Sequence, residues 1–73
     1  MPRIPPTKAR DVVAAFKRLG WKERKAKGGH KILVKDGCGH LSIPMSRGDV
    51  KAGTLHSLVE AAGITVEEFL DAL

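Results

Sequence analysis

The segment Lys-Gly-Gly-His-Lys at residues 27–31 combines three properties that suit action on a phosphodiester. Two glycines, Gly28 and Gly29, directly precede His30. Because glycine has no Cβ, the backbone at such a step can approach a ligand closely. Histidine is the side chain best suited to moving protons near neutral pH, and the lysine on each side would hold an anion. The pattern predicts that His30 is a catalytic general acid or base acting on a bound phosphodiester.

The basic residues are concentrated in the same part of the chain. Residues 17–35 hold eight lysines and arginines and one acidic residue, Glu23, whereas residues 36–73 hold two basic and six acidic residues. A dense basic segment is typical of a polyanionic partner, although a solvated charged surface that binds nothing is the alternative. With the two glycines, the expected RNA-binding residues, which would contact phosphate or stabilise its developing charge, are Arg24, Lys25, Lys27, Lys31 and the more distant Lys35.

Metal and cofactor chemistry have little support in the sequence. Cys38 and His40 form a Cys-x-His pair, and His56 is the remaining nitrogen ligand besides His30. A zinc site needs three or four such ligands, and the carboxylates are scattered, so we expect no metal and no cofactor. If the chain cleaves RNA, attack by the 2′-hydroxyl without a metal is the natural route.

The composition also bears on the compartment. No apolar stretch approaches the roughly 18 residues needed to span a membrane, and the N-terminal residues contain no apolar run typical of a signal peptide. The single cysteine excludes an intrachain disulfide, which fits a reducing environment. We therefore expect a cytoplasmic protein with no membrane association.

Hydrophobic periodicity predicts an α+β fold in the order α-β-β-β-α, with a short extra C-terminal helix. The expected architecture has two layers, with the helices on one face of a three-stranded antiparallel sheet. Thr7 would cap the first helix, Gly28-Gly29 and Asp36-Gly37 are turn signals, and Thr65-x-x-Glu68 is a capping box. The expected elements are a helix at 8–19, strands at 21–26, 31–35 and 40–43, a loop at 45–52, and helices beginning near 53 and 65.

Side-chain alternation in the second strand leaves two possibilities for the histidine. Ile32 and Val34 share one face of that strand, and we expect this face to lie in the core. His30 has the same parity, so a packed, hydrogen-bonded histidine is the alternative to a catalytic one. Trp21, which follows the first helix, is expected to close the core rather than to stack on a base.

Seventy-three residues correspond to one domain, residues 1–73. The proline-rich segment 1–7 is expected to be flexible.

Several short motifs together resemble the HicA-type mRNA interferase toxins, over about residues 9–64. They are Leu-Gly-Trp at 19–21, Lys-Gly-Gly-His at 27–30, Ile-Pro at 43–44, Lys-Ala-Gly-Thr-Leu at 51–55 and Ala-Gly at 62–63. The resemblance implies a fold like the double-stranded RNA-binding domain and metal-independent endoribonuclease activity on mRNA. It also implies a HicB-type antitoxin that blocks the site, and it makes His30 the catalytic histidine. The family usually has serine where this chain has Gly29.

The sequence therefore predicts the toxin of a type II toxin–antitoxin pair, with mRNA and a HicB-type antitoxin as its partners. Two other hypotheses use the same basic region. One is a non-catalytic RNA-binding module of the same fold, whose affinity would fall steeply with salt. The other is a basic surface that mainly serves an acidic protein partner.

Overall fold

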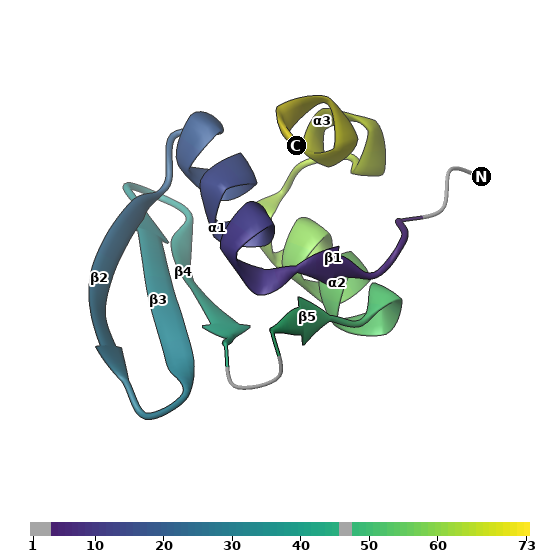
Figure 1. The fold of residues 1–73 in the computed structure, drawn as a ribbon. Coiled ribbons are helices and arrows are strands. Elements are labelled where there is room, and N and C mark those ends of the chain that lie inside the picture. The colour runs from purple at the N-terminus through teal and green to yellow at the C-terminus, as the bar shows by residue number, and fades with distance from the viewer. Residues whose placement is uncertain (1–3, 46–47) are drawn as a thin grey trace.

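The computed structural model describes residues 4–45 and 48–73, and the side chains of residues 25–27 lie outside this description. Its elements run in the order β-α-β-β-β-β-α-α (Figure 1). They are β1 (Thr7–Lys8), α1 (Ala9–Arg18), β2 (Lys22–Lys27), β3 (His30–Lys35), β4 (Gly39–Pro44), β5 (Asp49–Val50), α2 (Ala52–Ala62) and α3 (Val66–Ala72).

The main sheet contains β2, β3 and β4 in that order, all antiparallel. Gly28 adopts φ 67° in the β2–β3 turn, and Gly37 adopts φ 78° between β3 and β4. Such positive φ values favour glycine because a Cβ would be strained there. The register is irregular between Arg24 and Lys27, where β2 carries one extra residue against β3. The predicted meander of three strands is confirmed, with His30 included in the second of them.

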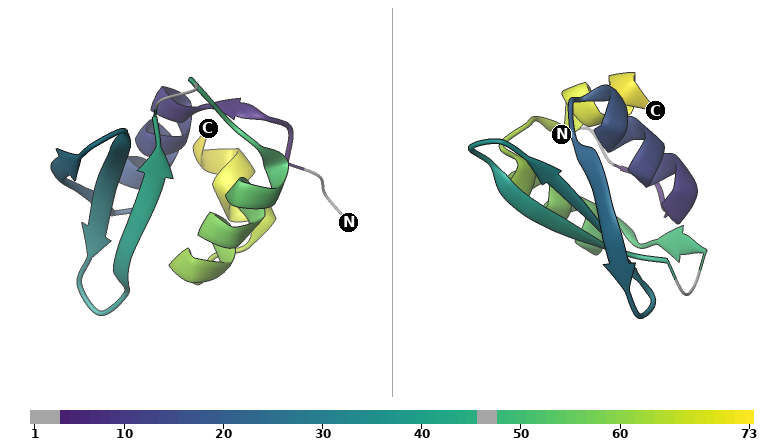
Figure 2. Two further views of the ribbon diagram at one scale, coloured as in Figure 1. Left: turned by 90° about the horizontal axis from the view of Figure 1, so that it is seen from below. Right: turned by 90° about the vertical axis from the view of Figure 1, so that its left-hand side faces the viewer.

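One face of this sheet is buried against the helices, and its other face is left uncovered (Figure 2). Helices α1 and α2 both approach β4. The α+β, two-layer architecture with a short C-terminal helix is therefore confirmed. The largest fully buried side chains are those of Ile4, Val12, Phe16, Leu33, Ile43, Val50, Leu55 and Phe69.

The predicted parity of β3 is wrong. Leu33 is fully buried, whereas Ile32 and Val34 are only half-buried. The face towards the helices therefore carries Lys31, Leu33 and Lys35, and the uncovered face carries Ile32 and Val34. The sequence favoured the face with two branched aliphatic residues, but lysine stems can lie along an apolar layer while their ammonium groups reach polar partners at its margin.

Helix α1 forms because its apolar residues recur at helical spacing, and its buried side includes Val12 and Phe16. Trp21 follows the helix and is 2% exposed. Its ring packs edge to face against Phe16, with 6.2 Å between the ring centroids. Its predicted core role is therefore confirmed. The end of α1 is held by a basic side chain, since Lys35 Nζ donates to the Leu19 carbonyl oxygen at 3.1 Å. Cations at this end complement the helix dipole.

The predicted N-cap of α1 is wrong. The capping position is Lys8, which makes no side-chain cap bond. Thr7 instead lies in β1, where it pairs with Val50 of β5, and its hydroxyl donates to the Pro5 carbonyl oxygen at 2.8 Å. Backbone pairing has taken the place of a side-chain cap, and the Ala9 amide donates to the Gly48 carbonyl oxygen at 2.7 Å.

The short β1–β5 ribbon was not predicted, and β5 lies inside the stretch expected to be a loop. Two-residue strands carry no usable periodicity. Of the segment expected to be flexible, residues 1–3 lie outside the described residues. Ile4 is 2% exposed in the core, and Thr7 is held by strand pairing.

The C-terminal helices follow their predicted signals closely. Gly63 ends α2 in the left-handed conformation at φ 71°. Thr65 and Glu68 form the predicted capping box, with the Thr65 amide donating to Glu68 Oε1 at 3.0 Å and the Glu68 amide donating to Thr65 Oγ1 at 3.1 Å. Phe69 then anchors α3 by packing against Phe16 at 5.3 Å between ring centroids.

Candidate active site and nucleic-acid interface

His30 is exposed at the start of β3, directly after the glycine turn. It pairs with Lys27 on β2 and with Pro44 on β4, so it lies between two neighbouring strands. The Met45 amide donates to the Gly29 carbonyl oxygen at 2.7 Å, which ties the turn to the end of β4. The alternative of a packed histidine is therefore wrong, because this side chain is open to solvent on a supported backbone.

Cross-strand pairing shows which residues share the uncovered face with His30. Paired residues point to the same side of a sheet, and successive residues alternate. Arg24, Ile32 and Ser42 form one row across the three strands. A second row, further from the turn, contains Lys22, Val34 and His40. This open face thus presents basic residues on β2, aliphatic residues at its centre and polar residues on β4.

Two of the predicted phosphate-binding lysines lie on the other face. Lys31 Nζ is 2.6 Å from Glu23 Oε1, and Lys35 is bound to the carbonyl oxygen at the end of α1. The structure therefore separates Lys31 and Lys35 from His30, although the three residues are close in sequence. Of the predicted cations whose side chains are described, Arg24 shares the open face with His30, and it is exposed.

Two further candidates lie in the half of β2 that leads into the glycine turn. Lys25 and Lys27 belong to β2 through their backbone, and Lys27 pairs with His30. Their side chains lie outside the described part of the structure. Gly28 and Gly29 are both exposed in the turn, as a site reached by a ligand requires.

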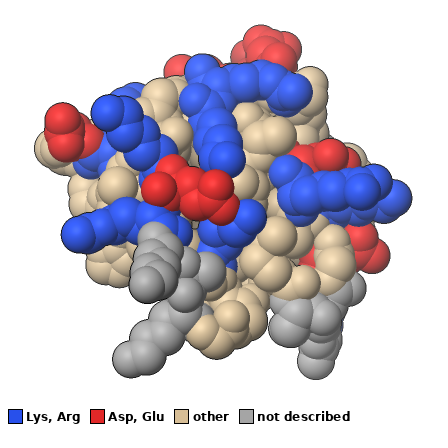
Figure 3. Space-filling view, turned by 60° about the vertical axis from the view of Figure 1, so that its left-hand side comes forward, with Lys and Arg blue, Asp and Glu red and all other residues tan. Residues whose placement is uncertain are grey.

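Basic side chains spread over the side of the molecule formed by α1 and β2, with acidic atoms enclosed among them (Figure 3). Glu23 supplies one such carboxylate, because it pairs with Lys17 of α1 as well as with Lys31 of β3. Hydrogen bonds from Lys31 and then from Lys17 lower the pKa of Glu23 below its usual range. The charge of this side is therefore partly neutralised in the unbound protein.

The other histidines are placed differently from His30. His40 shares the open face but pairs with Val34, four residues along β3. At roughly 3.3 Å per residue, this separation is too long for both histidines to act on one phosphate. His56 lies on α2. Across residues 4–45 and 48–73, no three His, Cys, Asp or Glu side chains gather as metal ligands would.

A family model described as the HicA toxin of bacterial toxin–antitoxin systems matches residues 9–64, most of the chain. The chain belongs to the HicA toxin family. The match runs from α1 through the glycine turn, β3, β4 and α2, and it ends before α3. A search among curated proteins found no match for the chain.

The chain is therefore a member of a family of toxins from bacterial toxin–antitoxin systems. Within the described residues, none of the helices has the length and apolar character needed to cross a membrane.

The residues that sequence reasoning missed are Lys22, Ser42 and Pro44, which join the open face only through the strand register. The hairpin turns could have indicated them, because turn length fixes register.

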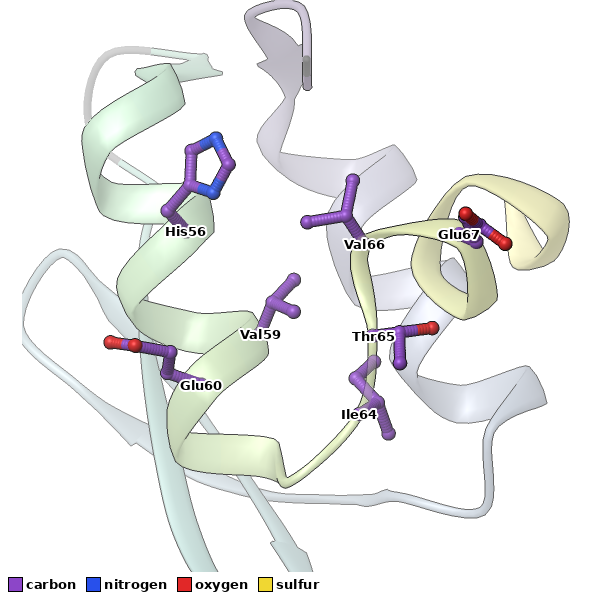
Figure 4. A pocket seen from close by; sticks show the side chains of 7 residues that line it. All are labelled: His56, Val59, Glu60, Ile64, Thr65, Val66 and Glu67. Carbon is purple, nitrogen blue, oxygen red and sulfur yellow. The ribbon is translucent and has the colours of Figure 1, made fainter. Parts of the chain in front are cut away.

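A groove lies between α2 and the start of α3, away from the open face of the sheet (Figure 4). It is a groove of about 470 Å³ in which Val59 and Val66 point toward one another, and His56 lies near its upper end. Glu60 and Glu67 stand at its margins. Carboxylates at the margins and apolar side chains on the walls do not favour the binding of a polyanion here.

Proposed function

We propose that this protein is the toxin of a type II toxin–antitoxin pair and acts as a metal-independent endoribonuclease on mRNA, with His30 as its general acid or base. The single observation that supports this most is the exposure of His30 beside the glycine turn, on the uncovered face of the sheet. Family membership gives the toxin role, and the basic residues of β2 give the affinity for RNA.

The proposed reaction is a transfer of the phosphodiester to the neighbouring 2′-oxygen. Neutral His30 takes the proton of the 2′-hydroxyl, the 2′-oxygen bonds to phosphorus, and the bond from phosphorus to the 5′-oxygen breaks. The 5′-oxygen takes a proton from water, and the hydroxide so formed takes the proton back from His30. The products are a 2′,3′-cyclic phosphate and a 5′-hydroxyl end, and no oxidant, metal or cofactor is required for this balance.

Each part of the open face has a role in this proposal. Exposed backbone at Gly28 and Gly29 lets the RNA chain approach, since neither residue has a side chain. Arg24 holds a phosphate on the same face as His30, and its planar guanidinium can bind two phosphate oxygens and oppose the charge that develops during attack. Lys25 and Lys27 extend the basic strand that carries it.

Recognition through the RNA backbone fits the composition of this face. Its described residues include Ile32, Val34 and Ser42 but no Phe, Tyr or Trp ring on which a base could stack. Contacts with phosphate fix position without specifying sequence. We propose further that a HicB-type antitoxin protein is the partner that restrains the toxin, and that both act in the cytoplasm.

The test uses purified protein, a labelled mRNA fragment and two matched alanine variants. His30→Ala should lower the cleavage rate by about 10²- to 10⁴-fold, and its expression should no longer arrest growth. His40→Ala removes a second exposed histidine from the same face and should cleave as the unaltered protein does. Circular dichroism confirms that both variants are folded.

The outcomes separate the competing functions. Unchanged cleavage in folded His30→Ala would refute the assignment of His30. RNA binding without cleavage, in the unaltered protein and the variant alike, would instead establish a non-catalytic RNA-binding module. Chelation of divalent metal ions should leave the rate unchanged, and the products should carry cyclic phosphate ends.

A further inference from the structure

A charge cluster lies outside the reaction proposed for His30. It consists of Lys17, Glu23 and Lys31. They come from three different elements, α1, β2 and β3. Glu23 Oε2 accepts a hydrogen bond from Lys17 Nζ at 3.0 Å, and Glu23 Oε1 lies 2.6 Å from Lys31 Nζ. One carboxylate thus joins two ammonium groups, with a separate oxygen for each.

The cluster is open to solvent. The side chains of Lys17, Glu23 and Lys31 are 46%, 35% and 31% exposed. Exposed ion pairs contribute little to stability and are screened by salt, so another anion can compete for the lysines at small cost. Two oxygens of a phosphate have a spacing similar to those of a carboxylate, and a phosphate carries the same sign of charge.

We propose that Lys17 and Lys31 form a phosphate-binding pair, that Glu23 occupies this pair in the unbound protein, and that a phosphate of the RNA chain takes the place of the carboxylate. This inference rests on the proposed function for the identity of the RNA. Glu23 then lowers the affinity for RNA, because RNA must displace its carboxylate before the two lysines contribute to binding.

The position of the cluster places the Lys17–Lys31 pair next to the open face that carries His30. β2 is an edge strand of the sheet. A ligand can therefore pass around its outer edge from one face of the sheet to the other. Glu23 stands between Lys22 and Arg24 in sequence, and these two neighbours belong to the open face. An RNA chain that rounds the edge of β2 meets Lys17 and Lys31 on one side, and Arg24 and His30 on the other.

The test compares two variants that make the same charge change in different parts of the molecule. Both are made in the His30→Ala protein so that the RNA stays intact. Glu23→Gln should tighten the binding of a short labelled RNA roughly tenfold, because two cations are released to contact phosphate. Glu60→Gln, on α2 at the acidic groove, should change the affinity less than about twofold, because its charge lies far from the RNA.

A second pair of variants identifies the lysines that give the gain. Adding Lys31→Gln to Glu23→Gln should remove most of the tightening. Adding Lys51→Gln, which removes an exposed lysine just before α2, should leave most of it. Equal tightening by Glu23→Gln and Glu60→Gln, or equal losses from the two lysine changes, would overturn the inference, since either result reflects net charge alone.

Inorganic phosphate separates failure of this inference from failure of the proposed function. In the Glu23→Gln protein, a phosphate titration followed by amide NMR should shift the signals of Lys17 and Lys31, with smaller shifts in the protein that keeps Glu23. If phosphate shifts these signals but no variant binds RNA, the proposed function fails and the phosphate pair stands. If RNA binds while Glu23→Gln changes neither the RNA affinity nor the phosphate-induced NMR shifts, the phosphate pair is wrong and the ribonuclease proposal stands.

Discussion

The two faces of β3 carry different kinds of residue with different tasks. On the uncovered side, His30, Ile32 and Val34 are exposed or half-buried. On the helix side, Leu33 is fully buried between two lysines whose ammonium groups are bound by protein oxygens. Alternation along six residues thus places an exposed histidine on one face and a buried leucine on the other, so neighbours in the sequence have different surroundings.

The largest expected effect tests the helix side of this comparison. Leu33→Ala should lower the free energy of unfolding by about 2–5 kcal/mol, because it leaves a cavity in a small core. Ile32→Ala, one residue away on the open face, should cost about 1 kcal/mol or less because Ile32 is only half-buried. Urea denaturation of both variants measures the difference, and equal losses would mean that the faces are assigned wrongly.

RNA binding tests the same division through charge. Arg24→Gln should weaken RNA binding several-fold and reduce the slope of log K against log salt by about 0.7–0.9, as expected for one phosphate contact. Lys35→Gln should leave both quantities unchanged, because Lys35 is bound at the end of α1. Fluorescence anisotropy over a range of salt provides the measurement, and a larger effect from Lys35 would reverse the proposed roles.

The stability contribution of Lys35 is the converse expectation. Lys35→Met should lower the free energy of unfolding by about 1 kcal/mol through loss of its bond to the Leu19 carbonyl oxygen. Lys22→Met, on the open face, should change it little. Thermal unfolding compares the two, and equal melting temperatures would show that the helix end needs no cation.

The two glycines of the turn give the smallest expected effect. Gly28 has φ 67°, whereas Gly29 is not among the positive-φ glycines of the described residues. Gly29→Ser should therefore stabilise the fold by about 0.4–1 kcal/mol by restricting the unfolded chain. Gly28→Ser should destabilise it by about 1 kcal/mol because a Cβ is strained there.

The same two proteins also address the departure from the family pattern, in which serine usually stands at position 29. A faster cleavage rate for Gly29→Ser at equal RNA affinity would show that the glycine limits turnover. An unchanged rate would show that the backbone at this turn is sufficient.

Sequence reasoning was most successful where a local signal determines the structure. The helices, the order of the three strands, the capping box at Thr65 and the glycine end of α2 all follow from propensity and spacing. It failed where tertiary contacts decide the outcome. Thr7 pairs with Val50 across the fold instead of capping its own helix, and no local pattern indicates a partner more than forty residues away.

The candidate site was predicted in its centre and not in its surroundings. His30 and the glycines follow from residue type and adjacency, and the structure exposes them as a site requires. Which cations share that face depends on the parity of β3, and two aliphatic residues outweighed one leucine in the sequence argument. Leu33 pairs with the buried Leu41 of β4 and Lys31 pairs with the buried Ile43, so the lysine-bearing face is the one that packs into the core.

Chemical rescue is the most direct test that His30 on the open face performs the chemistry. Cleavage of a short RNA by His30→Ala should be slow, and added imidazole should raise the rate in proportion to its neutral form. His40→Ala should cleave at the full rate without any response to imidazole. Full-rate cleavage by folded His30→Ala in the absence of imidazole would contradict the account.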